Sequence, residues 1–269
     1  MGYRFLIFGL LMFIACIAGQ VEAQHFVTDG LVSFWTFDRN SIDGNVVEDV
    51  WGNNDGKILG AQVVEGKINE ALDFDGASTM VTIPYDPIFD IPDATTVEAW
   101  IKLRVWSVGD RHSIMTKYDQ NQAKRYLQFA VRPTTSLSVF FGHSNGSTYI
   151  EGSMDVESPE WEGEWVHAAA SWSKTDGLPR VYVNGQEAAG YSVQTVWADV
   201  LSTNDLPWTI GAMPDFARYF DGAIDEVRIY NRQLSAAEIM RNFEVKSNSI
   251  AVQPAGKLAA TWSKVKSSF

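Results

Sequence analysis

The amino-acid sequence predicts an all-β sandwich. From Leu31 onward, short apolar or aromatic runs alternate with breaks rich in Gly, Asn, Asp and Pro, at the spacing typical of two packed sheets. Residues 95–103 alternate strictly, so one face of this strand is expected to be buried and the other wetter. No helical periodicity of any length precedes Ser235.

The predicted strands follow one another along the chain with turn residues between them. A polar loop over residues 38–56 separates the first two strands, and Asn184-Gly185 favours a type I′ hairpin turn, because both residues adopt positive φ at low cost. The predicted strands are residues 31–37, 57–63, 71–74, 80–84, 95–103, 113–118, 126–131, 137–141, 149–154, 165–172, 179–183, 186–189, 208–212 and 220–230.

The last strand and the segment after it form a distinctive pair. Residues 220–230 read as a buried strand, and Ser235 and Glu238 stand at the N-cap and capping-box positions of a short helix. Within this strand, the carboxylate of Asp225 lies among apolar residues and needs a partner. A bound cation and a buried hydrogen-bond network are the two alternatives.

Several segments together resemble, in the same order, the LamG-like domains of the concanavalin A-like lectin/glucanase superfamily. The ordered set covers residues 29–243, and it implies a two-sheet antiparallel jelly-roll sandwich with a short C-terminal helix, a fold that hosts many unrelated functions. The matching segments are GLVSFWTFD (30–38), ALDFDG (71–76), VEAWI (97–101), WVHAAA (165–170), VYVNG (181–185), IGA (210–212) and the closing stretch 220–235.

The first 23 residues have the layout of a secretory signal peptide. A charged start is followed by an apolar run and by Val-Glu-Ala, which predicts cleavage after Ala23 and a secreted or cell-surface location, extracellular or periplasmic. The apolar run is shorter than the ~20 residues that a bilayer core requires. The alternative is a lipoprotein leader with a lipid on Cys16. Without the leader the chain has no cysteine, so the domain predicted over residues 24–243 folds without disulfides.

The charge of the chain limits its partners. The formal net charge is −12, which argues against nucleic acid. It is compatible with cations and neutral polymers, and solubility alone explains it equally well. Residues 244–269 are instead a basic linker and tail, in which Leu258, Trp262 and Val265 share one helical face. This tail is expected either to dock on the domain, a partner or a membrane surface, or to be a loosely ordered terminus.

The resemblance also implies a structural calcium ion. In the family, carboxylates of the first-strand loop and of the closing strand meet at the edge of the sandwich, and calcium takes six to eight oxygen ligands. The loop here is one residue shorter than the common pattern and has Trp51 where a small residue is usual, so its ligand stays open between Asn53, Asn54 and Asp55. The alternative is that these residues only form turns. The predicted ligands are Asp38, Asp49, Asn54 and Asp225.

A hydrolase is the alternative that the superfamily name raises. The Glu-x-Asp-x-x-Glu strand of its glucanases is absent, and the acidic run 155–160 is broken by Pro159. Residues 142–146 match G-x-S-x-G but join two predicted strands, whereas a nucleophile elbow joins a strand to a helix. No enzymatic activity is therefore expected, although an unrecognised carboxylate pair stays open.

Carbohydrate binding is the function that the sequence favours. Sugar rings stack on aromatic side chains, so aromatic residues in loops or at strand ends are candidates, with rim packing as the alternative for each. The expectation is an exported binding or adhesion module for a glycan, or alternatively for a cell-surface protein. The candidate ligand-binding residues are Trp106, Trp161, Trp197, Phe216 and Tyr219.

Overall fold

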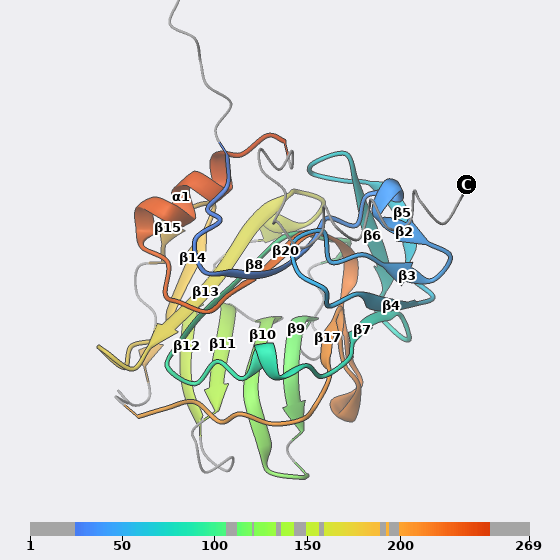
Figure 1. The fold of residues 1–269 in the computed structure, drawn as a ribbon. Helices are drawn as coiled ribbons and strands as arrows, with labels where there is room; N and C mark the ends of the chain where they lie inside the picture. The colour runs from blue at the N-terminus through green and yellow to red at the C-terminus, as the bar shows by residue number, and fades with distance from the viewer. Residues whose placement is uncertain are drawn as a thin grey trace, which may run out of the picture.

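The computed structural model describes residues 25–105, 112–119, 121–132, 136–142, 149–155, 159–188, 192–193 and 199–247. The predicted leader with Cys16, the tail beyond residue 247, Trp106 and Trp197 lie outside these residues. In the described part, two large antiparallel sheets pack face to face, and one helix covers part of one of them (Figure 1). The predicted two-sheet sandwich with a short C-terminal helix is confirmed.

The first sheet, sheet A, has eight strands, and its order is non-consecutive in sequence. β1 (Leu31–Trp35) lies off the main order and pairs with the second half of β20. The main order is β15 (Gln186–Glu187), β14 (Arg180–Val183), β13 (Val166–Ser173), β8 (Ala94–Leu103), β20 (Asp221–Tyr230), β6 (Glu70–Asp75) and β5 (Gln62–Glu65).

The second sheet, sheet B, has ten strands: β16 (Ser192–Val193), β12 (Tyr149–Asp155), β11 (Ser136–Gly142), β10 (Lys124–Arg132), β9 (His112–Asp119), β17 (Trp208–Ile210), β7 (Met80–Ile83), β4 (Gly56–Leu59), β3 (Val46–Val47) and β2 (Ile42–Asp43). A small hairpin, β18 (Ala212–Met213) and β19 (Arg218–Tyr219), contacts β9. The short helical segments are η1 (Arg39–Ser41), η2 (Pro87–Phe89), η3 (Pro159–Trp161), η4 (Pro214–Phe216) and α1 (Ala236–Glu244).

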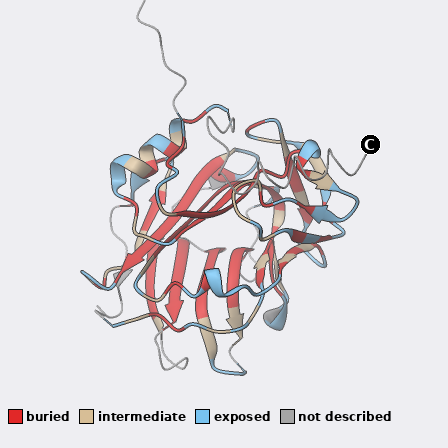
Figure 2. Cartoon of the chain, in the orientation of Figure 1, coloured by how far each residue is buried: buried red, intermediate tan, exposed pale blue. Residues whose placement is uncertain are grey.

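The main core lies between the two sheets, where the facing strands are buried along most of their length (Figure 2). Trp35, Trp172, Trp208 and Phe74 are completely buried in it, which explains how a sandwich of this breadth is filled. A second apolar cluster lies on the opposite face of sheet A, beneath α1 and the N-terminal segment. Its members include Phe26, Leu31, Phe34, Ile68, Ala169, Tyr182, Tyr230, Leu234 and Ile239.

Two strand predictions are wrong. Residues 208–212, expected to form one strand, are divided at Gly211 between β17 in sheet B and β18 in the small hairpin. Residues 57–63, expected to form one strand, are divided between β4 in sheet B and β5 in sheet A. The break lies at Gly60, whose φ of +75° is a left-handed conformation that glycine adopts without steric cost. The apolar pattern continues through the break because both strands bury side chains in the same core, so the pattern alone does not reveal the change of sheet.

The capping box of α1 is confirmed. The Ser235 hydroxyl accepts a hydrogen bond from the Glu238 backbone N–H, and the Glu238 carboxylate accepts one from the Ser235 N–H at 2.8 Å. Arg232 also binds the same carboxylate through two nitrogens, at 2.7 and 3.1 Å. These donors, Arg232 above all, lower the pKa of Glu238 to about 2. Within the described residues, no helix is long and apolar enough to cross a bilayer.

A buried polar network attaches α1 to sheet A. The guanidinium of Arg228 donates to Glu98 at 3.0 Å and pairs with Glu226, and all three side chains are buried. The side-chain amide N–H of Asn242 in α1 donates a hydrogen bond to the Glu98 carboxylate at 2.9 Å. The side-chain carbonyl oxygen of Asn242 accepts one from the Val27 backbone N–H at 2.7 Å. The helix and the N-terminal segment thus supply hydrogen bonds that these buried charges require.

We predict that Glu238→Gln reduces the free energy of unfolding by about 1 kcal/mol at neutral pH, because the substitution weakens the capping box and removes the ion pair with Arg232. Since the pKa of Glu238 is lower in the folded state, its contribution is present above the unfolded pKa of about 4.3 and is lost as the pH falls toward 2. The variant should therefore approach wild type in acid.

Urea unfolding across this pH range measures the effect. Asp43→Asn, which removes an exposed carboxylate on β2, is the matched control and should leave the profile unchanged. A Glu238→Gln variant with wild-type stability at neutral pH would contradict the prediction.

Candidate ligand sites

Asp225 occupies an irregular position in β20. The register between β20 and β8 shifts between Asp225 and Arg228, and Glu226 has a φ of +53°. The register shift is a β-bulge, and the consecutive charged side chains of Asp225 and Glu226 are both buried at this position. The Asp225 carboxylate is completely buried, and its Oδ2 accepts hydrogen bonds from the backbone N–H groups of Lys67 (2.9 Å) and Ile68 (3.0 Å). Its Oδ1 has no hydrogen-bond partner in the described part of the chain.

Asp38 approaches the same loop from another direction. Its Oδ1 accepts the Glu70 N–H at 3.1 Å and its Oδ2 accepts the Asn69 side-chain amide at 3.3 Å. The two aspartates therefore hold loop 66–70 between them. Burial, together with the neighbouring negative charges of Glu226 and Asp38, raises the pKa of Asp225 to about 9. A buried carboxylate oxygen without a donor, beside a second carboxylate, fits a cation as its missing partner.

The other two predicted calcium ligands have a different role. The Asp49 carboxylate accepts five hydrogen bonds: from the backbone N–H groups of Phe34, Trp51, Gly52 and Asn54 and from the Asn54 side-chain amide. It closes loop 49–55 onto β1. Among the described contacts, neither Asp49 nor Asn54 shares a hydrogen-bond partner with Asp38 or Asp225. The turn-forming alternative thus accounts for Asp49, and the cation chemistry concentrates at Asp38 and Asp225.

The unusual Trp51 of this loop also has a structural explanation. Its indole N–H donates to the Leu31 carbonyl at 2.8 Å, and its ring packs against the second apolar cluster. The next residue is Gly52, and a larger residue would not fit there because a Cβ would lie 2.4 Å from the Asp49 carboxylate. Within the described residues, no group of three or more His, Cys, Asp and Glu side chains is arranged around one point as a metal centre. A cation at Asp38 and Asp225 would thus need carbonyl and water ligands as well.

The predicted aromatic residues are placed unequally. Trp161 in η3 is 8% exposed and packs into the main core, which argues against a sugar-stacking role at this position. Tyr219 in β19 is half-buried and is the predicted aromatic residue that retains exposed surface. The backbone of Phe216 lies in η4, but its side chain is outside the described part, as are Trp106 and Trp197.

The outer face of sheet B carries a cluster that the sequence analysis missed. Gln128, Phe140 and Glu151 are register neighbours on β10, β11 and β12, on the side of the sheet away from the main core. All three are buried, at 2%, 4% and 5% exposure, so they form the base of the cluster and its accessible surface comes from the half-buried residues around them. Tyr149 packs edge-to-face on Phe140, with ring centroids 5.0 Å apart. The Arg132 guanidinium lies 5.0 Å from the centre of the Phe140 ring and pairs with Glu151.

Aromatic and charged groups continue along this face. The Arg125 guanidinium lies 5.8 Å from the Tyr118 ring and 5.9 Å from the Tyr149 ring. Beside Tyr118 is a hollow of about 130 Å³ between β9 and η4, and burial with the nearby charge of Asp119 raises the pKa of Asp215 on its wall. We call the set the sheet B face, which consists of Tyr118, Arg125, Gln128, Arg132, Phe140, Tyr149 and Glu151.

A sequence signal for the sheet B face existed in the alternation of the strands. In β10, Leu127, Phe129 and Val131 enter the main core, so Gln128 and Arg132 must point outward. Sugar-stacking residues were expected in loops and at strand ends, so outward-facing residues within the strands were not predicted.

A comparison with protein-family models matches residues 75–240 to the model described as the concanavalin A-like lectin/glucanases superfamily. The chain belongs to this superfamily. The match includes β7 through most of α1, so the resemblance noted in the sequence is confirmed. Comparison with curated protein sequences finds no match.

Solved structures of similar fold include toxin binding domains and a domain of an arabinanase. The binding domain of Paraclostridial Mosquitocidal Protein 1 superposes with a TM-score of 0.63 at 14% identity, covering 80% of this chain and 52% of that one. The ligand-binding domain of botulinum neurotoxin serotype D, in complex with N-acetylneuraminic acid, gives 0.60 at 14% identity, covering 80% and 51%. The present chain thus spans about half the length of each of these two solved chains.

Domain 4 of AbnA, an extracellular arabinanase from Geobacillus stearothermophilus, is similar over nearly its whole length. Its structure in complex with arabinotriose gives a TM-score of 0.54 at 20% identity, covering 80% of this chain and 98% of that one. At these identities, the likeness shows a shared superfamily fold.

We predict that Asp49→Ala lowers the free energy of unfolding by at least about 2 kcal/mol, because it leaves several buried N–H groups without an acceptor. Chemical denaturation measures this, with Asp43→Ala at an exposed position as the control. A variant that keeps wild-type stability but loses a response to calcium would instead show that Asp49 is a ligand.

Proposed function

We propose that this chain is an exported, non-catalytic module that binds a glycan through the sheet B face. The observation that carries the proposal is that the half-buried side chains of Tyr118, Tyr149, Arg125 and Arg132 lie together on that face. The buried residues Gln128, Phe140 and Glu151 support them from beneath. Aromatic rings offer apolar surfaces to sugar C–H groups, and the polar groups satisfy hydroxyls. Structures of the same fold in complex with arabinotriose and N-acetylneuraminic acid support this class of ligand.

Export and the partner complete the proposal. The predicted leader 1–23 supports a secreted or cell-surface location, with a lipid on Cys16 as the alternative form of attachment. The basic tail 244–269 is the second proposed contact with a membrane surface. A cell-surface protein, rather than a free glycan, is the alternative partner of the same face.

The second part of the proposal is a structural calcium ion at Asp38 and Asp225. Its support is the buried Oδ1 of Asp225, which lacks a hydrogen-bond donor, and the two carboxylates that share loop 66–70. Calcium would supply the positive charge that keeps Asp225 ionised in this buried position. Backbone carbonyls and water would complete its ligands.

Hydrolysis is a second candidate function, because one observation favours it. Asp119 and Asp215 interact electrostatically beside the hollow on the sheet B face, and the pKa of Asp215 is raised. A carboxyl group of raised pKa beside a second carboxyl group is found in glycosidases. Asp119, however, already accepts two hydrogen bonds from Gln122, which favours a structural role. Turnover of a bound glycan that Asp215→Asn abolishes would establish the enzyme.

We predict that Tyr149→Ala and Arg132→Met each weaken glycan binding at least about tenfold, since each removes a group worth about 1.4 kcal/mol or more at the centre of the sheet B face. A glycan array identifies the ligand, with arabinotriose as the first soluble probe, and calorimetry measures the dissociation constants.

Matched controls are Tyr85→Ala and Arg39→Met, which remove exposed side chains of the same types elsewhere. They should bind like wild type. Unchanged affinity in both sheet B variants, with the fold intact by circular dichroism, would contradict the proposed site.

We predict that calcium at 100 times its dissociation constant adds about 2.7 kcal/mol to the free energy of unfolding, which corresponds to roughly 5–10 °C in the midpoint of thermal unfolding for a domain of this size. Asp225→Asn should abolish this rise. The variant should be about as stable as wild type in chelator, because the amide oxygen still accepts from the backbone N–H groups of Lys67 and Ile68.

Differential scanning calorimetry in calcium and in chelator tests this. Asp49→Asn tests the other half of the predicted ligand set, and it should keep the calcium response. Wild-type protein with the same midpoint in calcium and in chelator would eliminate the calcium site.

A further inference from the structure

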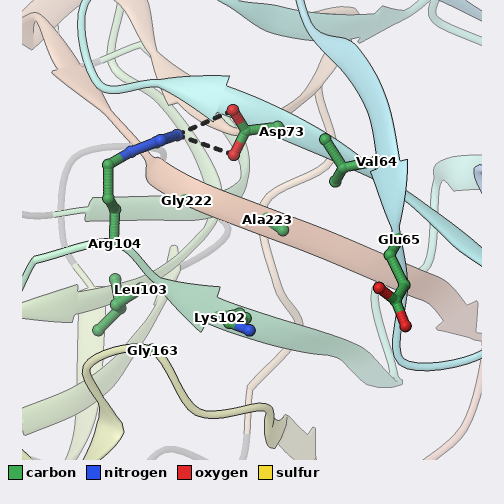
Figure 3. Close-up of a pocket in the computed structure, with 9 residues that line it drawn as sticks. All are labelled: Val64, Glu65, Asp73, Lys102, Leu103, Arg104, Gly163, Gly222 and Ala223. Atoms are coloured by element: carbon green, nitrogen blue, oxygen red, sulfur yellow. Dashed lines mark hydrogen bonds and ion pairs between the residues drawn. The ribbon is translucent and has the colours of Figure 1, made fainter.

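The outer face of sheet A is only half covered, and its open half contains a groove of about 480 Å³ (Figure 3). α1 and the N-terminal segment cover the half near β13 and the end of β20 (Figure 1). The groove crosses β5, β6, β20 and β8. Four adjacent strands include three interstrand spacings, so the groove is roughly 14 Å wide across the sheet. Its lining residues are Val64, Glu65, Asp73, Lys102, Leu103, Arg104, Gly163, Gly222 and Ala223.

Small residues on β20 create the hollow. Lys102, Ala223 and Asp73 are register neighbours on three adjacent strands, so the short Ala223 side chain lies between two long polar ones. Gly222 is required by close packing, because a Cβ there would lie 2.1 Å from the Lys102 carbonyl oxygen. Val64 adds aliphatic surface on the β5 side, as Figure 3 shows. The floor is therefore apolar and formed by rigid strands.

One wall of the groove is a fixed ion-pair cluster. The Arg104 guanidinium donates to both oxygens of Asp73, at 2.8 and 2.9 Å, and to Asp221 at 2.7 Å. Burial and the nearby charge of Asp221 raise the pKa of Asp73. Since one guanidinium holds both carboxylates, these oxygens are oriented and still have capacity to accept hydrogen bonds from a ligand.

Two polar groups in the groove have no such partner. Lys102 is half-buried, and Glu65 lies on the opposite side of the groove on the edge strand β5 (Figure 3). Neither side chain forms a hydrogen bond or an ion pair with any described residue. A donor and an acceptor therefore face each other across an apolar floor, and both are free to bind a ligand.

The charges decide the class of ligand. The groove has two cationic side chains, Lys102 and Arg104. Three anionic ones, Asp73, Asp221 and Glu65, nearly balance their charge, so the groove does not select an anion. Neutral hydroxyls match it, since each can accept from the Lys102 ammonium and donate to a carboxylate. We propose that this groove is a second glycan-binding site, which binds a neutral oligosaccharide and is separate from the sheet B face.

The consequence is a bivalent domain. The groove and the sheet B face lie on the outer faces of different sheets, with the main core between them. Two sites on opposite faces can bind two segments of a glycan polymer. Binding of the first segment then raises the effective concentration of the second, which increases the overall affinity without any new contact. The inference shares with the proposed function only the class of ligand, so either site can fail without the other.

The test follows the methyl groups of Ala223 and Val64 by NMR in the purified chain, because both side chains line the groove. Arabinotriose, cellotriose and maltotriose are titrated separately. At least one of these neutral sugars should shift both methyl signals saturably. Lys102→Met and Glu65→Gln should each raise the dissociation constant at least tenfold, which is about 1.4 kcal/mol. Lys57→Met, at an exposed position on β4, is the matched control and should stay within twofold of wild type.

Combined variants separate the two sites. Tyr149→Ala with Arg132→Met should leave the Ala223 and Val64 shifts intact, and Lys102→Met should leave binding at the sheet B face intact. Calorimetry with a sugar that binds both sites should give a stoichiometry of two bound sugars per wild-type chain and one bound sugar per chain of each variant. Failure of all three sugars to shift Ala223 and Val64, or unchanged affinity in both Lys102→Met and Glu65→Gln, overturns the proposal.

Discussion

The burial of three charged residues of β20 organises the surroundings of sheet A. Asp225, Glu226 and Arg228 are all completely inaccessible, on a strand that pairs with β8 on one side and with β6 and β1 on the other. An unpaired buried charge costs several kcal/mol, so each requires partners from outside the strand. Glu98 of β8 satisfies Arg228, and loop 66–70 satisfies one oxygen of Asp225.

The covering elements of this face are consequences of the same requirement. Asn242 reaches from α1 to Glu98, and the N-terminal segment binds Asn242 and the Tyr230 hydroxyl through the backbone of Val27. The apolar cluster beneath α1 then adds the burial that keeps these bonds dry. α1 and the N-terminal segment thus combine apolar packing with a polar network. In loop 66–70, on the other hand, the donors reach only one oxygen of Asp225. Its Oδ1 has no hydrogen-bond partner among the described residues, and that oxygen is why a cation is proposed there.

The two outer faces of the sandwich differ in chemistry, and this difference bears on function. The sheet B face combines aromatic rings with polar groups, whereas the open half of sheet A presents charged side chains over small residues. The superfamily fold is compatible with many activities, so function must be argued from such sites. The proposed glycan binding depends on the residues of these faces, and the likeness to solved binding domains supplies only the framework.

The sequence by itself determined the features that depend on neighbours in the chain. Strand alternation has a period of two, which located β8 and β10. The second face of β8, expected to be wetter, is buried as well, because Thr96, Glu98 and Trp100 lie on the side of sheet A that α1 and the N-terminal segment cover. The capping box of Ser235 and Glu238 involves residues three apart, and the Asn184-Gly185 turn has positive φ at both positions, 49° and 79°, as its sequence predicts. The ordered motifs then indicated the jelly roll.

Only the tertiary structure decided the features that join distant segments. It divided residues 57–63 between two sheets, buried Trp161 in the core, and turned Asp49 into a hydrogen-bond acceptor for its own loop and for β1. It also placed Lys102, Ala223 and Asp73 in one row across three strands. The physical reason is that register and sheet order set which residues become neighbours, and no local pattern in the chain records those distances.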